Sequence, residues 1–367
     1  MPTPLQALAE RGQSAWIDYL SRPFVRDGDL AGLVDDGVVG VTSNPTIFQG
    51  AIAEGNSYDD QMRDLLAHET DPQKVFFALA VEDIQGACDL LAPVFDRGEE
   101  TRDGWVSLEV DPNLAHDAEK TASQAKQLHA MVQRKNLFVK IPGTQEGLAA
   151  IEETIANQIP VNVTLLFSLE RHRQAAEAYL RGLRRLRDSG GDLSQVASVA
   201  SFFVSRVDTE ADKRLEQIGG HDELMGKLAI ANAKLAYQSY KEIFSGDDWE
   251  ELKAAGGSPQ RCLWASTSTK NPNYRDVVYV EELIGPETVN TMPRQTIEAV
   301  QDHAKIESTL ERGVDEARQT LEELADAGVD YDDVVAVLER EGVEKFDASF
   351  KELIEGVAAK REQLVTA

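Results

Sequence analysis

Apolar residues recur along the chain in two alternating patterns. Short runs with apolar residues at every second position predict strands at 16–20, 38–42, 106–110, 137–141, 160–167, 196–203, 261–267 and 289–292. Longer runs with helical spacing predict helices at 29–36, 58–68, 71–95, 115–132, 147–157, 168–188, 208–218 and 221–244, and another from about 280. Strands that alternate with helices predict an α/β protein, and this number of strands favours a (β/α)8 TIM barrel over a doubly wound sheet.

Glu, Leu and Ala dominate the chain after His303, which predicts two or three helices that pack on the barrel. We therefore expect one domain over residues 1–367, with the barrel at about 12–305 and a helical C-terminal extension at about 306–367. Neither a Gly-x-Gly-x-x-Gly turn nor a Gly-x4-Gly-Lys-Ser/Thr turn is present, which disfavours a nucleotide-binding fold.

Polar residues within the predicted strands share one parity. Because strand side chains alternate between two faces, Lys140 lies opposite the aliphatic face of its strand. The other strands have the same arrangement, with Asp18; Thr42 and Asn44; Ser107, Glu109 and Asp111; Asn162 and Thr164; and Ser201 and Phe203 opposite aliphatic residues. In a barrel the aliphatic side chains of each strand face the helices and the side chains of the other parity face the interior. Polar groups at the carboxyl ends of the strands form the active sites of barrel enzymes. The sequence therefore predicts a site where these side chains meet.

Lys140 is the residue that indicates a particular chemistry. A buried lysine is costly unless its amine is used, and burial lowers the pKa of the amine, which frees a neutral nucleophile for Schiff-base formation. Each residue also has a structural interpretation when taken alone. Lys140 could pair with a carboxylate, and Glu109 could lie on a solvated face. Asn44 before Pro45 is typical of a turn, and Asp18 could cap a helix. Their convergence favours a functional site.

Composition narrows the possible partners. The formal net charge of -27 at pH 7 disfavours binding to nucleic acid or to an anionic membrane. An anionic substrate would need a local group of cations. Cys88 and Cys262 are the only cysteines, too few for a disulfide framework or a zinc site. With no signal peptide and no long apolar run, we expect a soluble cytoplasmic protein.

Four segments at the predicted strands resemble the signature of the transaldolase family. They are 41–48 (VTSNPTIF), 106–111 (VSLEVD), 138–144 (FVKIPGT) and 162–168 (NVTLLFS). The resemblance runs from about residue 12 to 303, and the length and acidic helical tail resemble the longer bacterial form.

The resemblance implies a barrel enzyme of the pentose phosphate pathway that uses neither cofactor nor metal and is a monomer or homodimer. Its members transfer a dihydroxyacetone unit from sedoheptulose 7-phosphate or fructose 6-phosphate to glyceraldehyde 3-phosphate or erythrose 4-phosphate. Such an enzyme belongs to the transferases.

The resemblance also implies roles for four catalytic residues. Lys140 would attack the C2 carbonyl of the ketose phosphate to form the Schiff base, and Asp18 would take the C4 hydroxyl proton during cleavage. Glu109 and Thr164 would hold a water that moves protons while the carbinolamine dehydrates.

Eight further positions are implied to bind the substrate: Thr42, Asn44, Asn162, Ser201, Phe203, Arg206, Ser266 and Lys270. Asn44 and Ser201 would bond the substrate hydroxyls. Arg206 would bind the phosphate, although it could instead form a surface pair with Asp208 or Glu210. Many family members carry arginine at the position of Lys270, which keeps the charge but lacks bidentate geometry.

Three alternatives to this function can be weighed against the sequence. A fructose-6-phosphate aldolase uses the same lysine but releases dihydroxyacetone. Those relatives are shorter, lack the acid found here at Glu109 and carry tyrosine where Phe203 stands. A catalytically silent barrel is disfavoured because Lys140 and its acidic neighbours are all present. A deoxyribose-phosphate aldolase is disfavoured by segment 41–48.

The C-terminal extension carries apolar residues at helical spacing, namely Tyr331, Phe346, Phe350 and Leu353. They either pack on the barrel or close over the mouth of the active site, and the spacing favours packing.

Overall fold

A computed structural model describes residues 2–53, 55–98 and 102–366 of the chain. Its strands form one closed parallel barrel in sequence order. They are β1 (Gln13–Asp18), β2 (Val38–Thr42), β3 (Trp105–Glu109), β4 (Leu137–Pro142), β5 (Val161–Leu166), β6 (Ser198–Phe203), β7 (Arg261–Ala265) and β8 (Thr288–Met292). The predicted (β/α)8 fold is confirmed, although β1 begins at Gln13 rather than at residue 16.

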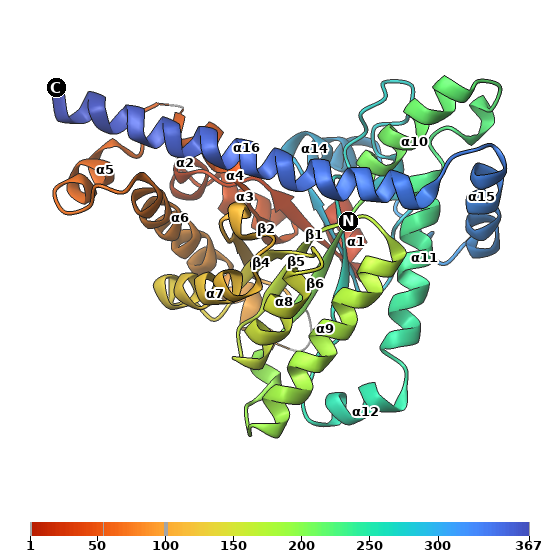
Figure 1. The fold of residues 1–367 in the computed structure, drawn as a ribbon, viewed down its shortest axis with the longest axis horizontal. Coiled ribbons are helices and arrows are strands. Elements are labelled where there is room, and N and C mark those ends of the chain that lie inside the picture. The colour runs from red at the N-terminus through yellow and green to blue at the C-terminus, as the bar shows by residue number, and fades with distance from the viewer. Residues whose placement is uncertain (1, 54, 99–101, 367) are drawn as a thin grey trace.

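Helices pack around this barrel (Figure 1). They are α1 (Pro4–Glu10), α2 (Arg22–Arg26), α3 (Asp29–Asp36), α4 (Pro45–Ala53), α5 (Asp59–Leu66), α6 (Pro72–Phe95), α7 (Ala118–Val132), α8 (Gly147–Ala156), α9 (Leu169–Asp188), α10 (Ser205–Ile218), α11 (Leu228–Ile243), α12 (Asp247–Ala254), α13 (Val278–Glu281), α14 (Arg294–His303), α15 (Val314–Asp326) and α16 (Tyr331–Thr366). The last two form the predicted C-terminal extension.

Several boundaries differ from the sequence-based expectation for local reasons. Helix α1 was not predicted, and it begins at a capping box in which the Thr3 side chain accepts the Gln6 amide. The helix expected at 221–244 was too long, because Gly226 adopts a φ of 71° and α11 begins only after it. The seventh strand was also too long, because Ser266 has a φ of 56° and leaves the extended conformation after Ala265.

Aromatic side chains fill part of the barrel interior. The rings of Trp105 and Phe138 stack at a centroid distance of 4.1 Å, and Trp16 lies 6.2 Å from Phe138. A Cβ at Gly40 would lie 2.4 Å from the Trp16 ring, so only glycine leaves room for that indole. This packing makes the interior a solid core beneath the carboxyl ends of the strands.

A buried polar network closes the amino end of the barrel. Arg261 Nη1 lies 3.1 Å from Asp103 Oδ1, and its Nη2 donates to Ser14 Oγ at 2.6 Å and to the Thr288 carbonyl at 2.8 Å. Asp103 also accepts from Ser14 Oγ at 2.7 Å and from Trp16 Nε1 at 3.3 Å. The network thus joins β1, β7 and β8 to the segment before β3.

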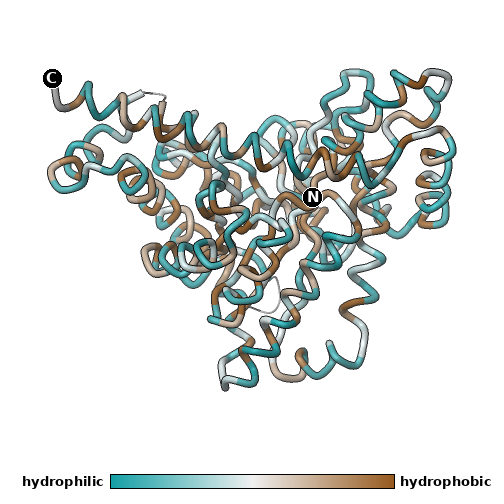
Figure 2. Tube along the Cα trace, viewed as in Figure 1, coloured by the Kyte–Doolittle hydropathy of each residue, from teal (hydrophilic) through white to brown (hydrophobic). Residues whose placement is uncertain are grey.

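Helix α16 crosses the molecule along its long axis (Figure 1). It is amphipathic, and apolar and polar positions alternate along its trace (Figure 2). Phe346, Phe350 and Leu353 are buried on the side that packs on the rest of the protein, which confirms the predicted packing for Phe350 and Leu353. No helix in the part of the chain that the structure describes is both long enough and apolar enough to span a membrane.

Candidate active site

The carboxyl ends of β3 and β4 bring an acid and an amine together. Glu109 and Lys140 are register partners, and Glu109 Oε2 lies 3.2 Å from Lys140 Nζ. Lys140 Nζ also donates to the Ser43 carbonyl at 3.1 Å. Only 5% of either residue is exposed. Lys140 therefore pairs with a carboxylate and at the same time faces the interior of the barrel.

Asp18 lies at the end of β1 and faces the same space. Its Oδ1 accepts a hydrogen bond from Thr42 Oγ1 at 2.8 Å, and the Thr42 hydroxyl lies 2.7 Å from that of Thr291. Burial raises the pKa of Asp18, while Lys140, the Thr42 hydrogen bond and Arg206 act in the opposite direction. A carboxyl group in this setting can accept a proton from a substrate hydroxyl and hold it.

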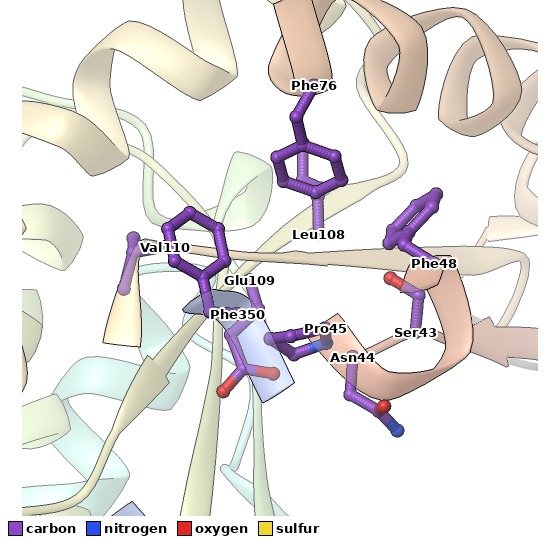
Figure 3. Close-up of a pocket in the computed structure, with 9 residues that line it drawn as sticks. All are labelled: Ser43, Asn44, Pro45, Phe48, Phe76, Leu108, Glu109, Val110 and Phe350. Atoms are coloured by element: carbon purple, nitrogen blue, oxygen red, sulfur yellow. The ribbon is translucent and has the colours of Figure 1, made fainter. Parts of the chain in front are cut away.

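Glu109 is buried beside a small cavity. Burial raises the pKa of Glu109 to about 7, although Lys140 lowers it. Neither Glu109 oxygen accepts an aligned hydrogen bond, and the Thr164 hydroxyl makes none. The cavity, of about 10 Å³, is lined by Glu109, Asn44 and Phe350 among others (Figure 3). That is about the space of one water molecule, so the unpaired oxygens have room for a water partner.

Two amides lie beside the lysine in different ways. Asn162 is the register partner of Lys140 on β5; it donates to Ser107 Oγ at 3.1 Å and accepts from Ser201 Oγ at 2.7 Å. Asn162 therefore holds Ser201 in place. Asn44 Oδ1 accepts the Ile47 amide at 3.0 Å at the start of α4, so the turn interpretation of Asn44 is also realised.

Cations gather at the carboxyl ends of β6 and β7. The Arg206 guanidinium lies 5.0 Å from the centroid of the Phe203 ring, and Lys270 Nζ donates to Ser268 Oγ at 2.8 Å. Burial lowers the pKa of Lys270, and repulsion from Arg206 and Lys345 lowers it further. Positive charges that repel one another beside a cavity indicate a place for an anion.

The surface pairing considered for Arg206 does not form. Asp208 accepts hydrogen bonds from the Ala229 amide and the Tyr279 hydroxyl, both at 2.7 Å. Glu210 pairs with lysine and arginine of its own helix. Arg206 is thus left to face the cavity.

A cavity of about 220 Å³ brings most of the predicted side chains together. It is lined by Asp18, Thr42, Asn44, Lys140, Thr164, Ser201, Phe203, Arg206, Ala265, Ser266, Ser268, Lys270, Thr291, Pro293 and Phe346. Two predicted residues do not line it: Glu109 faces the smaller cavity, and Asn162 lies behind Ser201. Within the described ranges, no group of three or more His, Cys, Asp or Glu side chains is placed to hold a metal ion.

Sequence reasoning missed some of these residues. Thr291 lies on β8, within the strand predicted at 289–292, and its parity along that strand indicates that it faces the interior. Packing was favoured for Phe346 over closure of the active-site mouth, but its ring lines the cavity. No local signal distinguishes an aromatic residue that lines a cavity from one that only packs.

Comparison with known proteins now adds to this geometry. A family model described as Transaldolase/Fructose-6-phosphate aldolase matches residues 15–357. The chain belongs to this family.

Individual relatives of the transaldolase/fructose-6-phosphate aldolase family agree with that match. A protein of Saccharopolyspora erythraea named Transaldolase is 51% identical over 362 residues, which cover 98% of this chain and 97% of the relative. A Transaldolase of Acidothermus cellulolyticus is 51% identical over 366 residues, covering 99% and 98%. One of Mycolicibacterium smegmatis is 50% identical over 355 residues, covering 96% and 95%. The resemblance drawn from the four strand segments is confirmed. The family match also includes most of α16.

Proposed function

We propose that this protein is a transaldolase that moves a dihydroxyacetone unit between sugar phosphates through a Schiff base on Lys140. The donors are sedoheptulose 7-phosphate or fructose 6-phosphate, and the acceptors glyceraldehyde 3-phosphate or erythrose 4-phosphate. One observation carries the proposal: a buried amine, a carboxyl group and two cations face one space at the carboxyl end of a barrel, and a second carboxyl group lies 3.2 Å from that amine. The names of the relatives support it.

Schiff-base formation needs an amine that can lose its proton. Glu109 lies 3.2 Å from Lys140 Nζ, and its pKa of about 7 lets it accept and return a proton near neutral pH. A water held between Glu109 and Thr164 would carry protons to and from the carbinolamine oxygen. The unpaired oxygens of both residues support this role.

Cleavage requires a base at the C4 hydroxyl of the ketose. Asp18 faces Lys140 across the cavity, and the Thr42 hydroxyl holds its carboxylate in position. As Asp18 takes the C4 hydroxyl proton, the bond between C3 and C4 breaks and its electrons move toward the iminium nitrogen. Asp18 then returns the proton to the oxygen of the acceptor aldehyde when the new bond forms.

The remaining lining residues fit a phosphorylated sugar. Asn44 and Ser201 would bond the hydroxyls of the dihydroxyacetone unit, with Asn162 fixing Ser201. Arg206 and Lys270 would bind the phosphate, and Ser266 would add a hydroxyl. These two cations supply the local positive charge that an anionic substrate requires in a chain with a formal net charge of -27.

Two residues favour transfer over release of dihydroxyacetone. Glu109 is an acid that the fructose-6-phosphate aldolases lack, and Phe203 stands where those aldolases carry tyrosine. A ring without a hydroxyl cannot hold a water beside the intermediate. We further propose that the enzyme works in the cytoplasm without a cofactor, and that its chain forms one domain. We also propose that it is a monomer or a homodimer. Size-exclusion chromatography with light scattering would distinguish these two oligomeric states.

Trapping with borohydride tests the proposal. The protein is treated with borohydride and fructose 6-phosphate, without acceptor, and analysed by intact and peptide-level mass spectrometry. A reduced adduct of dihydroxyacetone on Lys140 is expected, and sedoheptulose 7-phosphate should form when erythrose 4-phosphate is supplied without borohydride. Absence of the adduct despite substrate binding would overturn the lysine mechanism, and an adduct on another lysine would overturn the assignment of Lys140.

A further inference from the structure

Helix α16 places one aromatic ring inside the cavity that the strands form. The centroid of the Phe346 ring lies 5.7 Å from Lys140 Nζ, and only 5% of the residue is exposed. Phe346 lines the cavity together with Asp18, Thr164 and Ser201. Among the described lining residues it alone comes from the C-terminal extension. The ring is therefore close to any group carried on the lysine nitrogen.

Contacts on both sides of Phe346 hold this part of α16 in place. Before it, a Cβ on Gly342 would lie 3.1 Å from a Leu165 methyl group, so the helix passes close to β5 there. After it, Ser349 Oγ accepts a hydrogen bond from Thr46 Oγ1 at 2.9 Å on α4. One turn beyond Phe346, Phe350 covers the small cavity beside Glu109 (Figure 3). The position of the Phe346 ring is thus set by the packing of the whole helix.

We propose that Phe346 keeps water away from the intermediate on Lys140 between cleavage and transfer, and so determines that the enzyme transfers the dihydroxyacetone unit rather than releasing it. This inference rests on the proposed function. After cleavage the aldehyde product leaves, and the remaining enamine must persist until an acceptor aldehyde binds. A closed apolar cover protects such a reactive intermediate from solvent.

Release consumes one water, and its steps are balanced. The enamine carbon takes the proton that Asp18 received from the C4 hydroxyl, which gives an iminium. Water then adds to the iminium carbon, and the bond from that carbon to Lys140 Nζ breaks. The products are dihydroxyacetone and the free lysine amine. The water consumed equals the water expelled when the Schiff base formed, so release needs no other reactant.

Phe346 adds a second control on this step to the missing hydroxyl of Phe203, and its ring is the one that lies 5.7 Å from Lys140 Nζ. The second aromatic residue of the cavity, Phe203, lies against the Arg206 guanidinium, where the phosphate of the substrate is proposed to bind. Most other groups around Lys140 are hydroxyls, carboxyls or amides that attract water. Removal of the Phe346 ring would open space beside these polar groups, and a polar space of that size fills with water.

The ratio of release to transfer tests the proposal. We would measure dihydroxyacetone formed from fructose 6-phosphate, and sedoheptulose 7-phosphate formed when erythrose 4-phosphate is added, for wild type, Phe346→Ala, Phe346→Leu and Leu353→Ala. Both rates are measured on the same sample, so the ratio does not depend on the folded fraction. Leu353 is the matched control, because it is buried on the same helix and does not line the cavity.

We expect the ratio to rise roughly tenfold or more in Phe346→Ala, to rise less in Phe346→Leu, and to stay unchanged in Leu353→Ala. Equal loss of both rates in Phe346→Ala and Phe346→Leu would overturn the proposal, as would an equal rise in Leu353→Ala. If Phe346→Ala does not fold, the Phe346→Leu ratio alone decides. A wild-type protein that forms no sedoheptulose 7-phosphate would instead refute the proposed function.

Discussion

The two ends of the barrel hold similar charged groups but pair them differently. At the amino end, Arg261, Asp103 and Ser14 bond one another in a closed network. At the carboxyl end, Lys140 lies 3.2 Å from Glu109, yet neither oxygen of this carboxyl group accepts an aligned hydrogen bond. Both sets are buried, so the difference in pairing does not arise from exposure to solvent.

This difference separates what stabilises the fold from what performs the chemistry. A buried ion pair with complete hydrogen bonding tolerates its desolvation cost, and loss of one partner is strongly destabilising. Buried groups whose hydrogen bonding is incomplete remain available to bind a substrate. They lower the stability of the protein, and the packing of the rest of the fold compensates for this loss. The conserved architecture of barrel enzymes places stability at the amino end and catalysis at the carboxyl end.

The largest expected effect is at the carboxyl end. Lys140→Met should lower kcat for transfer by about 10⁴-fold or more, because it removes the amine that lies beside Glu109 and is proposed to form the Schiff base. A coupled assay for sedoheptulose 7-phosphate measures it, and thermal melting checks the fold. Lys135→Met is the matched control. Lys135 is exposed in the turn just before β4, the strand that carries Lys140, and its variant should keep full activity. Substantial transfer by folded Lys140→Met would show that Lys140 is not the nucleophile.

Next comes the amino end, where the loss should appear in stability rather than in rate. Arg261→Met leaves Asp103 buried without its cation and should reduce the free energy of unfolding by about 3–5 kcal/mol. The kcat of the protein that remains folded should not change. Arg294→Met is the control, since its pair with Asp29 is exposed and contributes about 0–1 kcal/mol. Urea unfolding measures both, and equal losses in the two variants would contradict the assignment.

A smaller effect is expected for Arg206, the residue proposed to bind the phosphate of the substrate. Arg206→Gln removes a charge-assisted contact and should raise KM for fructose 6-phosphate by roughly 10- to 150-fold, equivalent to about 1.5–3 kcal/mol. The kcat should change much less. Unphosphorylated fructose serves as the control substrate, because it lacks the group that Arg206 is proposed to bind. A similar loss with both substrates would show that Arg206 does not act through phosphate.

The smallest effect concerns a buried acid outside the site. Burial raises the pKa of Asp208 from 3.8 to about 7, so the folded state binds its proton more tightly than the unfolded state. Its contribution to stability is therefore fully present below pH 3.8 and lost as the pH rises through about 7. Asp208→Asn lacks this titration, and its stability relative to wild type should rise by about 1 kcal/mol between pH 6 and pH 8.

Denaturant unfolding at the two pH values measures the Asp208 effect. The asparagine can still accept the Ala229 amide, so the fold is expected to persist. A relative stability that stays constant, or falls, from pH 6 to pH 8 would contradict the prediction.

Much of the site could be predicted from the alternation of residues along single strands. The parity that sets Lys140 and Glu109 opposite their aliphatic neighbours is a local property, because each strand side chain points away from the next. In a parallel barrel, equal levels on neighbouring strands then meet, as Glu109 and Lys140 do. The helix starts were less predictable, because the capping box at Thr3 precedes only a short helix.

The sequence by itself determined the barrel, the level of each polar residue along its strand and the family signature. These follow from periodicity and local motifs, which involve neighbours in the chain. Only the tertiary structure decided that Asn162 bonds Ser201, that Glu109 faces a cavity of its own, and that the Phe346 ring lies near Lys140. Those contacts join residues distant in sequence, and they depend on how whole elements pack, which no local pattern encodes.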